Sequence, residues 1–202
     1  MLPNWDADSP RLRENPTEVL REIVRAAEAR EMPSCESALR WQRRFLQGLQ
    51  VPDKRFVGSF RGEPGLEQIA VRVGTNYGVE PSAAADELKR FESKLQELVR
   101  ELDALVPVGQ VPNADQLSAI LDLCAWTHGE WIRIHPFANG NGRTARLWAN
   151  SLALRYGLPP FVRLRPRPNY GYGEAGMKAM RGDWRPTAAV FHKLLEVFLA
   201  EH

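Results

Sequence analysis

Cysteine is scarce in this chain, and its scarcity limits the class of protein to which the chain can belong. Only Cys35 and Cys124 occur among 202 residues. Small secreted domains that depend on disulfides carry many more, so a disulfide framework is not expected. The sequence is typical of a protein from a reducing compartment, and we expect a cytoplasmic location.

An excess of charge and a long apolar run are also missing. The 27 basic residues nearly balance the 25 acidic ones, for a net charge of +2, so nothing in the bulk electrostatics indicates binding to a nucleic acid. No apolar stretch approaches the length needed to span a membrane, and the polar, acid-containing N-terminus does not resemble a signal peptide. With 44% hydrophobic residues, the chain is expected to form a single globular domain over residues 1–202.

Helical spacing of apolar residues dominates the chain and predicts a mainly α fold. Residues 1–33 form an N-terminal helical segment, with its helix starting at Pro16 and ending before Pro33. Further helices are expected over residues 34–49, 83–105, 114–134, 144–156 and 187–199. The segment 114–157 is therefore two helices joined by a short loop.

Several conspicuous side chains have a structural interpretation. Phe137 is expected to anchor its loop in the core, and His128 to be a satisfied interior histidine, because no metal-ligand spacing surrounds it. Four tryptophans lie at spacings typical of a core: Trp41, Trp126, Trp131 and Trp148. The basic run Arg155, Arg163, Arg165 and Arg167 is interpreted as a solvated rim, with docking of a phosphate or a target as the alternative.

The segment HPFANGNGRTAR, residues 135–146, joins the two helices and carries the strongest functional signal. Gly140 and Gly142 allow a sharp turn with exposed N–H groups, directly before a helix start. That combination predicts an anion-binding turn. Arg143 and Arg146 share one helical face and can add forked hydrogen bonds to phosphate oxygens, and His135 can accept a proton near neutral pH.

These residues resemble the core motif of the Fic (Fic/Doc) family, H-P-F-x-(D/E)-G-N-G-R-x-x-R. Every fixed position matches except Asn139, where the family usually has an acidic residue. The resemblance implies a Fic-type helical bundle with a short β-hairpin flap. It also implies an enzyme, a protein adenylyltransferase that moves AMP from ATP to a hydroxyl side chain of a target protein.

Two other segments are similar to family features. Residues 57–61 and 69–74 resemble the two arms of the flap, within a flap region at 57–74, and residues 172–183 resemble the helix on the nucleotide side. The alternation of apolar residues over Ile69–Val73 independently predicts a strand. The resemblance implies that this strand, residues 69–73, holds a target protein by strand addition.

The resemblance also implies a role for each motif residue. The turn Gly140-Asn141-Gly142 would bind the phosphates of ATP, with Arg143 and Arg146 on the β- and γ-phosphates. His135 would be the general base. Mg²⁺ would bridge the phosphates, with Asn139 as a weakened, uncharged ligand.

Alternatives remain open. The same scaffold could transfer UMP, phosphate or phosphocholine, or it could bind a partner strand without catalysis. Inhibition by a separate small antitoxin-like protein is expected, because the family's inhibitory pattern S/T-x-x-x-E-G/N is broken by one position at Ser9 and Glu14. Self-inhibition by Glu14 acting on Arg146 is the alternative.

Overall fold

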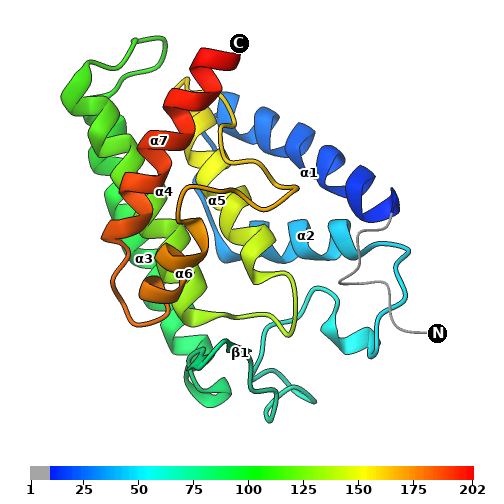
Figure 1. Cartoon of the computed structure of the whole chain (residues 1–202). Helices are drawn as coiled ribbons and strands as arrows, with labels where there is room; N and C mark the ends of the chain where they lie inside the picture. Colours follow the sequence, from blue (N-terminus) through cyan, green and yellow to red (C-terminus); the bar gives the residue numbers. More distant parts are fainter. Residues whose placement is uncertain (1–9) are drawn as a thin grey trace.

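A computed structural model describes residues 10–202, with side chains from residue 14 onward (Figure 1). Seven α-helices occur in that range: α1 (Pro10–Glu28), α2 (Cys35–Leu46), α3 (Pro81–Leu105), α4 (Ala114–Ile134), α5 (Asn141–Arg155), α6 (Tyr172–Ala179) and α7 (Arg185–Glu201). The only strands in the same range are β1 (Arg72–Val73) and β2 (Asn76–Tyr77). The mainly α fold with a short hairpin is therefore confirmed. None of the helices between residues 10 and 202 has both the length and the apolar character of a membrane span.

Helix α4 lies at the centre of the bundle. It packs against α3, α5, α6 and α7, while α5 also contacts α1 and α2 (Figure 1). The core between these helices is rich in aromatic rings, with Trp131 of α4 within 6 Å of both Trp148 and Phe137. Trp41 is buried as well, and the half-buried Trp126 stacks on Phe91. The expectation that the tryptophans belong to the core is confirmed, and their packing makes the α4–α5 junction rigid.

Helix boundaries follow the sequence pattern where a cap is present. Asn113 and Gln116 form a capping box at the start of α4, which begins and ends where the pattern predicts. In contrast, α1 begins at Pro10 and continues through Pro16, six residues before the expected start. The Pro16 ring is buried, and packing of α1 against α5 outweighs the lost main-chain hydrogen bond.

The hairpin differs from the expected one. Residues 57–61 form no strand, and β1 pairs instead with β2 in antiparallel register, Arg72 opposite Tyr77 and Val73 opposite Asn76. A two-residue connection with Gly74 at φ 61° closes the pair, which suits the tight turns of short hairpins. The expectation that residues 57–61 form one arm of the hairpin was wrong. Closing the two-residue loop between β1 and β2 costs less conformational entropy than closing a loop over residues 62–68, so the local pairing is favoured.

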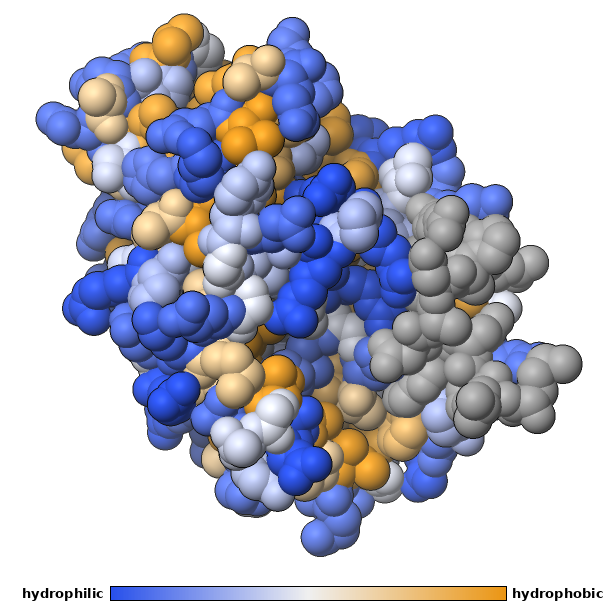
Figure 2. Space-filling view, in the orientation of Figure 1, coloured by the Kyte–Doolittle hydropathy of each residue, from blue (hydrophilic) through white to orange (hydrophobic). Residues whose placement is uncertain are grey.

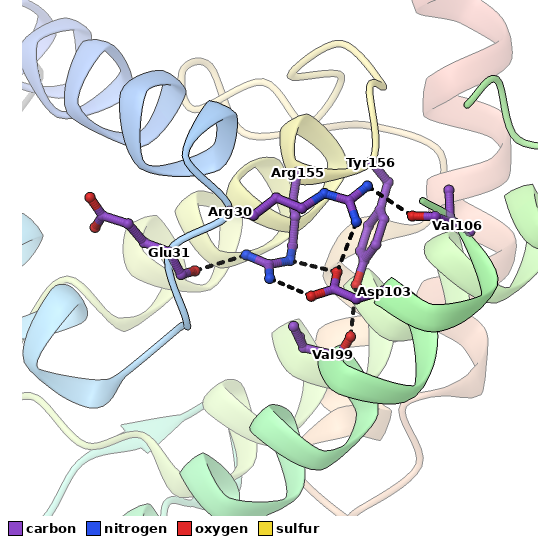
Figure 3. A network of polar contacts seen from close by, with 7 residues as sticks. All are labelled: Arg30, Glu31, Val99, Asp103, Val106, Arg155 and Tyr156. Carbon is purple, nitrogen blue, oxygen red and sulfur yellow. Dashed lines mark hydrogen bonds and ion pairs between the residues drawn. The ribbon is translucent and has the colours of Figure 1, made fainter. Parts of the chain in front are cut away.

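Arg155 is also placed differently from the solvated rim expected for it. Its side chain is buried and forms an ion pair with Asp103 of α3, with Nη2 2.6 Å from Oδ2 (Figure 3). Its Nη1 donates to the carbonyl of Glu31 at 2.8 Å, and Arg30 reaches Asp103 from the other side. The network ties α3 and α5 to the connection after α1, so this arginine stabilises the bundle from within.

Candidate active site

His135 ends helix α4 in a left-handed conformation, with φ 53° and ψ 54°. Its N–H still donates to the carbonyl of Trp131 at 3.0 Å, so the backbone turns away from the helix axis at this residue. A left-handed histidine is uncommon, and its strain is a mark of functional sites. The turn places the imidazole in the wall of a cavity at the end of α4.

The hydrogen bonding of His135 fixes its tautomer. Nδ1 lies 2.9 Å from the carbonyl oxygen of Ile132, and a carbonyl can only accept, so Nδ1 carries the proton. Nε2 then carries a lone pair, which has no hydrogen-bond partner among the described residues. Burial lowers the pKa of His135, and the positive charge of Arg61 lowers it further, against the opposing effect of the Ile132 carbonyl. The side chain is thus a neutral base at physiological pH.

The start of α5 has the geometry of the predicted anion-binding turn. The helix begins at Asn141, three residues earlier than expected, and its first N–H groups, those of Asn141 and Gly142, have no acceptor among the described residues. Gly140 precedes them with φ 99°, and a Cβ there would lie 2.5 Å from the Phe45 ring. A Cβ at Gly142 would meet nothing closer than 3.5 Å within the protein, so that side of the turn is open to a ligand.

Asn141 closes the loop onto itself. Its Oδ1 accepts from the N–H of Phe137 and its Nδ2 donates to the carbonyl of Phe137, both at 2.8 Å. Thr144 accepts a hydrogen bond from Trp131 Nε1 at 2.7 Å and so holds the first turn of α5 against α4. The Asn141 amide is therefore fully engaged with the protein, and its part is to shape the turn.

Arg143 is held in place before any ligand arrives. Its Nη2 donates to Asn139 Oδ1 at 2.9 Å, and its guanidinium lies 4.7 Å from the centre of the Phe45 ring. The carbonyl of Asn139 accepts from the buried Gln42, which also binds residues 56 and 58. Gln42 thus fastens the motif loop to α2, a role that its position on an amphipathic helix did not indicate.

Arg146 is held one turn further along α5. Its Nη1 donates to the Tyr172 hydroxyl at 3.2 Å and its Nη2 to the carbonyl of Leu164 at 3.1 Å, while its buried Nε has no partner in the described chain. Tyr172 also contacts His128 Nε2 at 2.7 Å. Burial, followed by the charges of Arg146 and Arg167, lowers the pKa of His128 to about 3, so this interior histidine stays neutral. Its buried Nδ1 has no partner among the described residues, so the expectation of a satisfied histidine was wrong for that atom.

These groups line one large cavity of about 1780 Å³. Typical small-ligand pockets measure roughly 300–1,000 Å³, so the cavity has room for a nucleotide and part of a second molecule. Figure 2 shows hydrophilic residues gathered in the middle of this face, where the connection between α5 and α6 crosses it in Figure 1. That connection adds a basic wall to the cavity, made of Arg163, Arg165 and Arg167. The arginines of the predicted rim thus face the same space as the motif, which favours the alternative of docking a phosphate.

The residues around the motif do not fit a Mg²⁺ site held by the protein. Within residues 10–202, no cluster of three or more His, Cys, Asp or Glu side chains could hold a metal. Asn139 offers one neutral oxygen, and that oxygen already accepts from a cationic Arg143. Magnesium is commonly held by one or two carboxylates together with substrate phosphates, and at this position the chain would offer only the amide oxygen of Asn139.

Comparison with known proteins agrees with the geometry. A model of the Fic/DOC family matches residues 35–153, which include the motif, the hairpin and helices α2 to α4. The chain belongs to the Fic/DOC family.

Named relatives are similar over part of the chain. A protein from Nematostella vectensis, "Protein adenylyltransferase Fic", is 36% identical over 84 residues, 40% of this chain and 19% of that protein. One of the same name from Aedes aegypti is 40% identical over 62 residues, 31% of this chain and 12% of that protein. The chain spans less than a fifth of the length of these two relatives.

Solved structures share the fold. Fic-1 (residues 134–508, E274G) from C. elegans aligns with a TM-score of 0.64 at 23% identity, over 97% of this chain and 52% of that one. The BepC protein of Bartonella tribocorum, with bound AMPPNP, aligns with a TM-score of 0.61 at 16% identity, over 96% and 91% of the two chains. The architecture is thus shared well beyond the motif.

Proposed function

We propose that this domain is a protein adenylyltransferase that transfers AMP from ATP to a hydroxyl side chain of a target protein. One observation carries the proposal: a neutral His135, with its Nε2 lone pair free, lines the same cavity as an open helix start and two preorganised arginines. Named relatives are adenylyltransferases, and BepC binds an ATP analogue in its own structure.

The chemistry follows from the positions of these groups. The α-phosphate would lie against the N–H groups at the start of α5, which stabilise the charge that develops on its oxygens. Nε2 of His135 takes the proton of the target hydroxyl while that oxygen bonds to the α-phosphorus. The bond from the α-phosphorus to the bridging oxygen breaks, and pyrophosphate leaves towards Arg143 and Arg146.

Transfer of label tests the proposal. The purified domain is incubated with a cell lysate and with ATP carrying label at the α- or at the γ-phosphate, and in parallel with α-labelled GTP, UTP and CTP. Label from the α-phosphate of ATP on protein is the expected result. Label from γ-phosphate indicates a kinase, label from UTP a uridylyltransferase, and no label from any donor contradicts a nucleotidyl transferase.

The hairpin edge is the proposed docking site for the target. The N–H of Gly78 donates to the carbonyl of Val71, so Val71 and Gly78 are a hydrogen-bonded pair and the next pair, Arg72 and Tyr77, is not. The main-chain groups of Arg72 therefore point outward from β1, the strand that lines the cavity. An extended target segment could pair with this edge and present its hydroxyl to the cavity.

Arg72→Pro is expected to raise the KM for a target peptide by about three- to tenfold, because it removes one outward main-chain donor worth roughly 0.5–1.5 kcal/mol. The affinity for an ATP analogue, measured by calorimetry, should not change. Tyr77→Pro is the matched control, since it removes the outward N–H of β2, which does not line the cavity. Arg72→Ala keeps the N–H and controls for loss of the side chain. An equal effect of both proline variants would contradict docking at β1.

Asn139→Asp is expected to strengthen the binding of Mg²⁺, for which the unmodified chain offers only a neutral amide oxygen at this position. A carboxylate at this position supplies a charged ligand of nearly the same shape, so the Mg²⁺ concentration for half-maximal transfer should fall about tenfold or more. Transfer rates are measured over a Mg²⁺ titration for both forms. Superimposable curves would show that position 139 does not reach a metal.

A separate small inhibitory protein is the proposed form of control. Glu14 is exposed, and α1 lines the cavity with Pro16, Thr17 and Leu20 instead. Arg146 is held by Tyr172 and Leu164, with no ion pair to Glu14. Ser9, the other half of the broken inhibitory pattern, lies outside the described residues.

Glu14→Gly should therefore leave the rate of ATP use by the isolated chain unchanged, measured as released pyrophosphate. A marked gain in that rate would support self-inhibition and contradict an external inhibitor.

A further inference from the structure

Arg61 is a buried arginine in the segment that leads to the hairpin. Its side chain is 2% exposed, and its guanidinium donates four hydrogen bonds, all to main-chain carbonyls. The acceptors are His135 (from Nε, 2.7 Å), Ile134 (from Nη2, 3.0 Å), Val79 (from Nη2, 2.7 Å) and Ile69 (from Nη1, 3.0 Å). Within the part of the chain whose side chains are described, no carboxylate forms an ion pair with it, so carbonyl dipoles balance its charge, helped at longer range by Glu80.

These acceptors come from two functional parts of the molecule. Ile134 and His135 are the last carbonyls of α4, where the helix dipole places partial negative charge that favours a cation. Ile69 precedes β1 and Val79 follows β2, so the same guanidinium closes the base of the hairpin. The main-chain N–H of Arg61 adds a fifth bond, to the carbonyl of Pro136 at 2.7 Å.

The contact between the hairpin and His135 is also tight. A Cβ built on Gly78 would lie 2.6 Å from Cβ of His135 and 3.1 Å from Nη2 of Arg61. The φ angle of Gly78 is not in the left-handed region, so the lack of space, and not the backbone, requires glycine. The end of β2 therefore fits directly against the histidine that Arg61 holds.

We propose that Arg61 is a positioning residue that fixes the docking hairpin and His135 at one separation, so that a hydroxyl held by β1 meets Nε2. The proposal rests on the proposed function for the role of β1. Only a planar fork of N–H donors can serve four carbonyls at once; a lysine ammonium has three donors and no fixed plane. The guanidinium also adds positive charge beside the imidazole.

Two substitutions separate geometry from charge. Arg61→Lys keeps the positive charge and loses the planar set of N–H donors. We expect kcat to fall by about 10²-fold, the loss that a 1 Å misplacement of a reacting group can cause. The acid limb of the pH profile should stay in place, because the charge is kept. Arg61→Gln loses both, so kcat should fall similarly and the acid limb should move up towards pH 6.5. The Kd for an ATP analogue should change less than twofold in either variant. A purely structural role would alter neither the pH profile nor kcat in a folded variant.

Gly78→Ala provides a test that leaves Arg61 intact. The added methyl group displaces His135 from the hairpin, so kcat should fall as in Arg61→Lys, without a change in ATP-analogue affinity. Arg55→Lys is the matched control, because Arg55 is an exposed arginine of the same segment that donates to the carbonyl of Gly65 and does not reach His135. Its kcat should match that of the unmodified chain. If neither Arg61 variant folds, the kcat of Gly78→Ala tests the role of Arg61 by itself.

An NMR titration of His135 keeps this inference separate from the proposed function. The pKa of the imidazole should rise in Arg61→Gln and not in Arg61→Lys, whether or not the domain transfers AMP. Absence of labelling by the unmodified chain would overturn the proposed function alone. An unchanged pKa in Arg61→Gln, or unchanged kcat in the folded Arg61 and Gly78 variants, would overturn the role of Arg61.

Discussion

His135→Asn is expected to slow labelling of target protein by about 10²- to 10⁴-fold, the usual contribution of a general base. Asparagine tolerates the left-handed backbone of this position better than alanine does. Its Nδ2 can also keep the hydrogen bond that Nδ1 makes to Ile132. The substitution removes Nε2, the proposed proton acceptor, and little else.

Binding of ATP should survive this change, because the proposed phosphate contacts come from the start of α5 and from its arginines. Calorimetry with an ATP analogue measures that affinity, and thermal unfolding checks the fold. His192→Asn, at a histidine of α7 that does not line the cavity, is the control for substitution itself. Labelling at an undiminished rate by His135→Asn would show that another group is the base.

The pH profile gives an independent measure of the same group. Since burial and Arg61 lower the pKa of His135, the imidazole remains neutral below its ordinary value of about 6.5. Activity requires the neutral form, so kcat/KM should be retained as pH falls to 6.5 and should decline only at lower pH. An acid limb at or above pH 6.5 would contradict the base assigned here.

Local patterns were sufficient where the deciding forces are local. Helix α4 was predicted over its full length from its apolar spacing, and the Asn113 cap found at its start also acts within a few residues. The motif at residues 135–146 stands out in the sequence because glycines directly before a helix start leave N–H groups open, an arrangement that favours an anion. Both features can be read from fewer than thirty consecutive residues.

Features that depend on distant partners were missed. Arg61 looks like any surface arginine in its own segment, and only the fold brings it to carbonyls 73 and 74 residues away. Arg155 was assigned to a basic rim because its partner, Asp103, lies 52 residues earlier. The arms of the hairpin were misassigned because alternation of apolar residues does not say which strand will pair with which.

Asn141→Ala is expected to lower the free energy of unfolding by about 2–4 kcal/mol and to impair transfer. The substitution leaves both the N–H and the carbonyl of Phe137 without partners in a buried loop, and each unsatisfied group costs roughly 1–3 kcal/mol. With the loop unclosed, the N–H groups at the start of α5 lose the geometry that an α-phosphate requires. Urea denaturation measures the first effect and labelling well below the unfolding transition measures the second.

Asn150 provides a matched comparison on the same helix. It is equally buried and also makes two hydrogen bonds to one main chain, donating to the carbonyl of Val162 at 2.8 Å and accepting from its N–H at 3.0 Å. Asn150→Ala should therefore lower the free energy of unfolding by a similar amount. It should loosen the basic wall of the cavity and leave the motif turn intact. We expect it to raise the KM for ATP with kcat retained, while Asn141→Ala lowers kcat. Equal kcat values in the two variants would mean that Asn141 contributes stability alone.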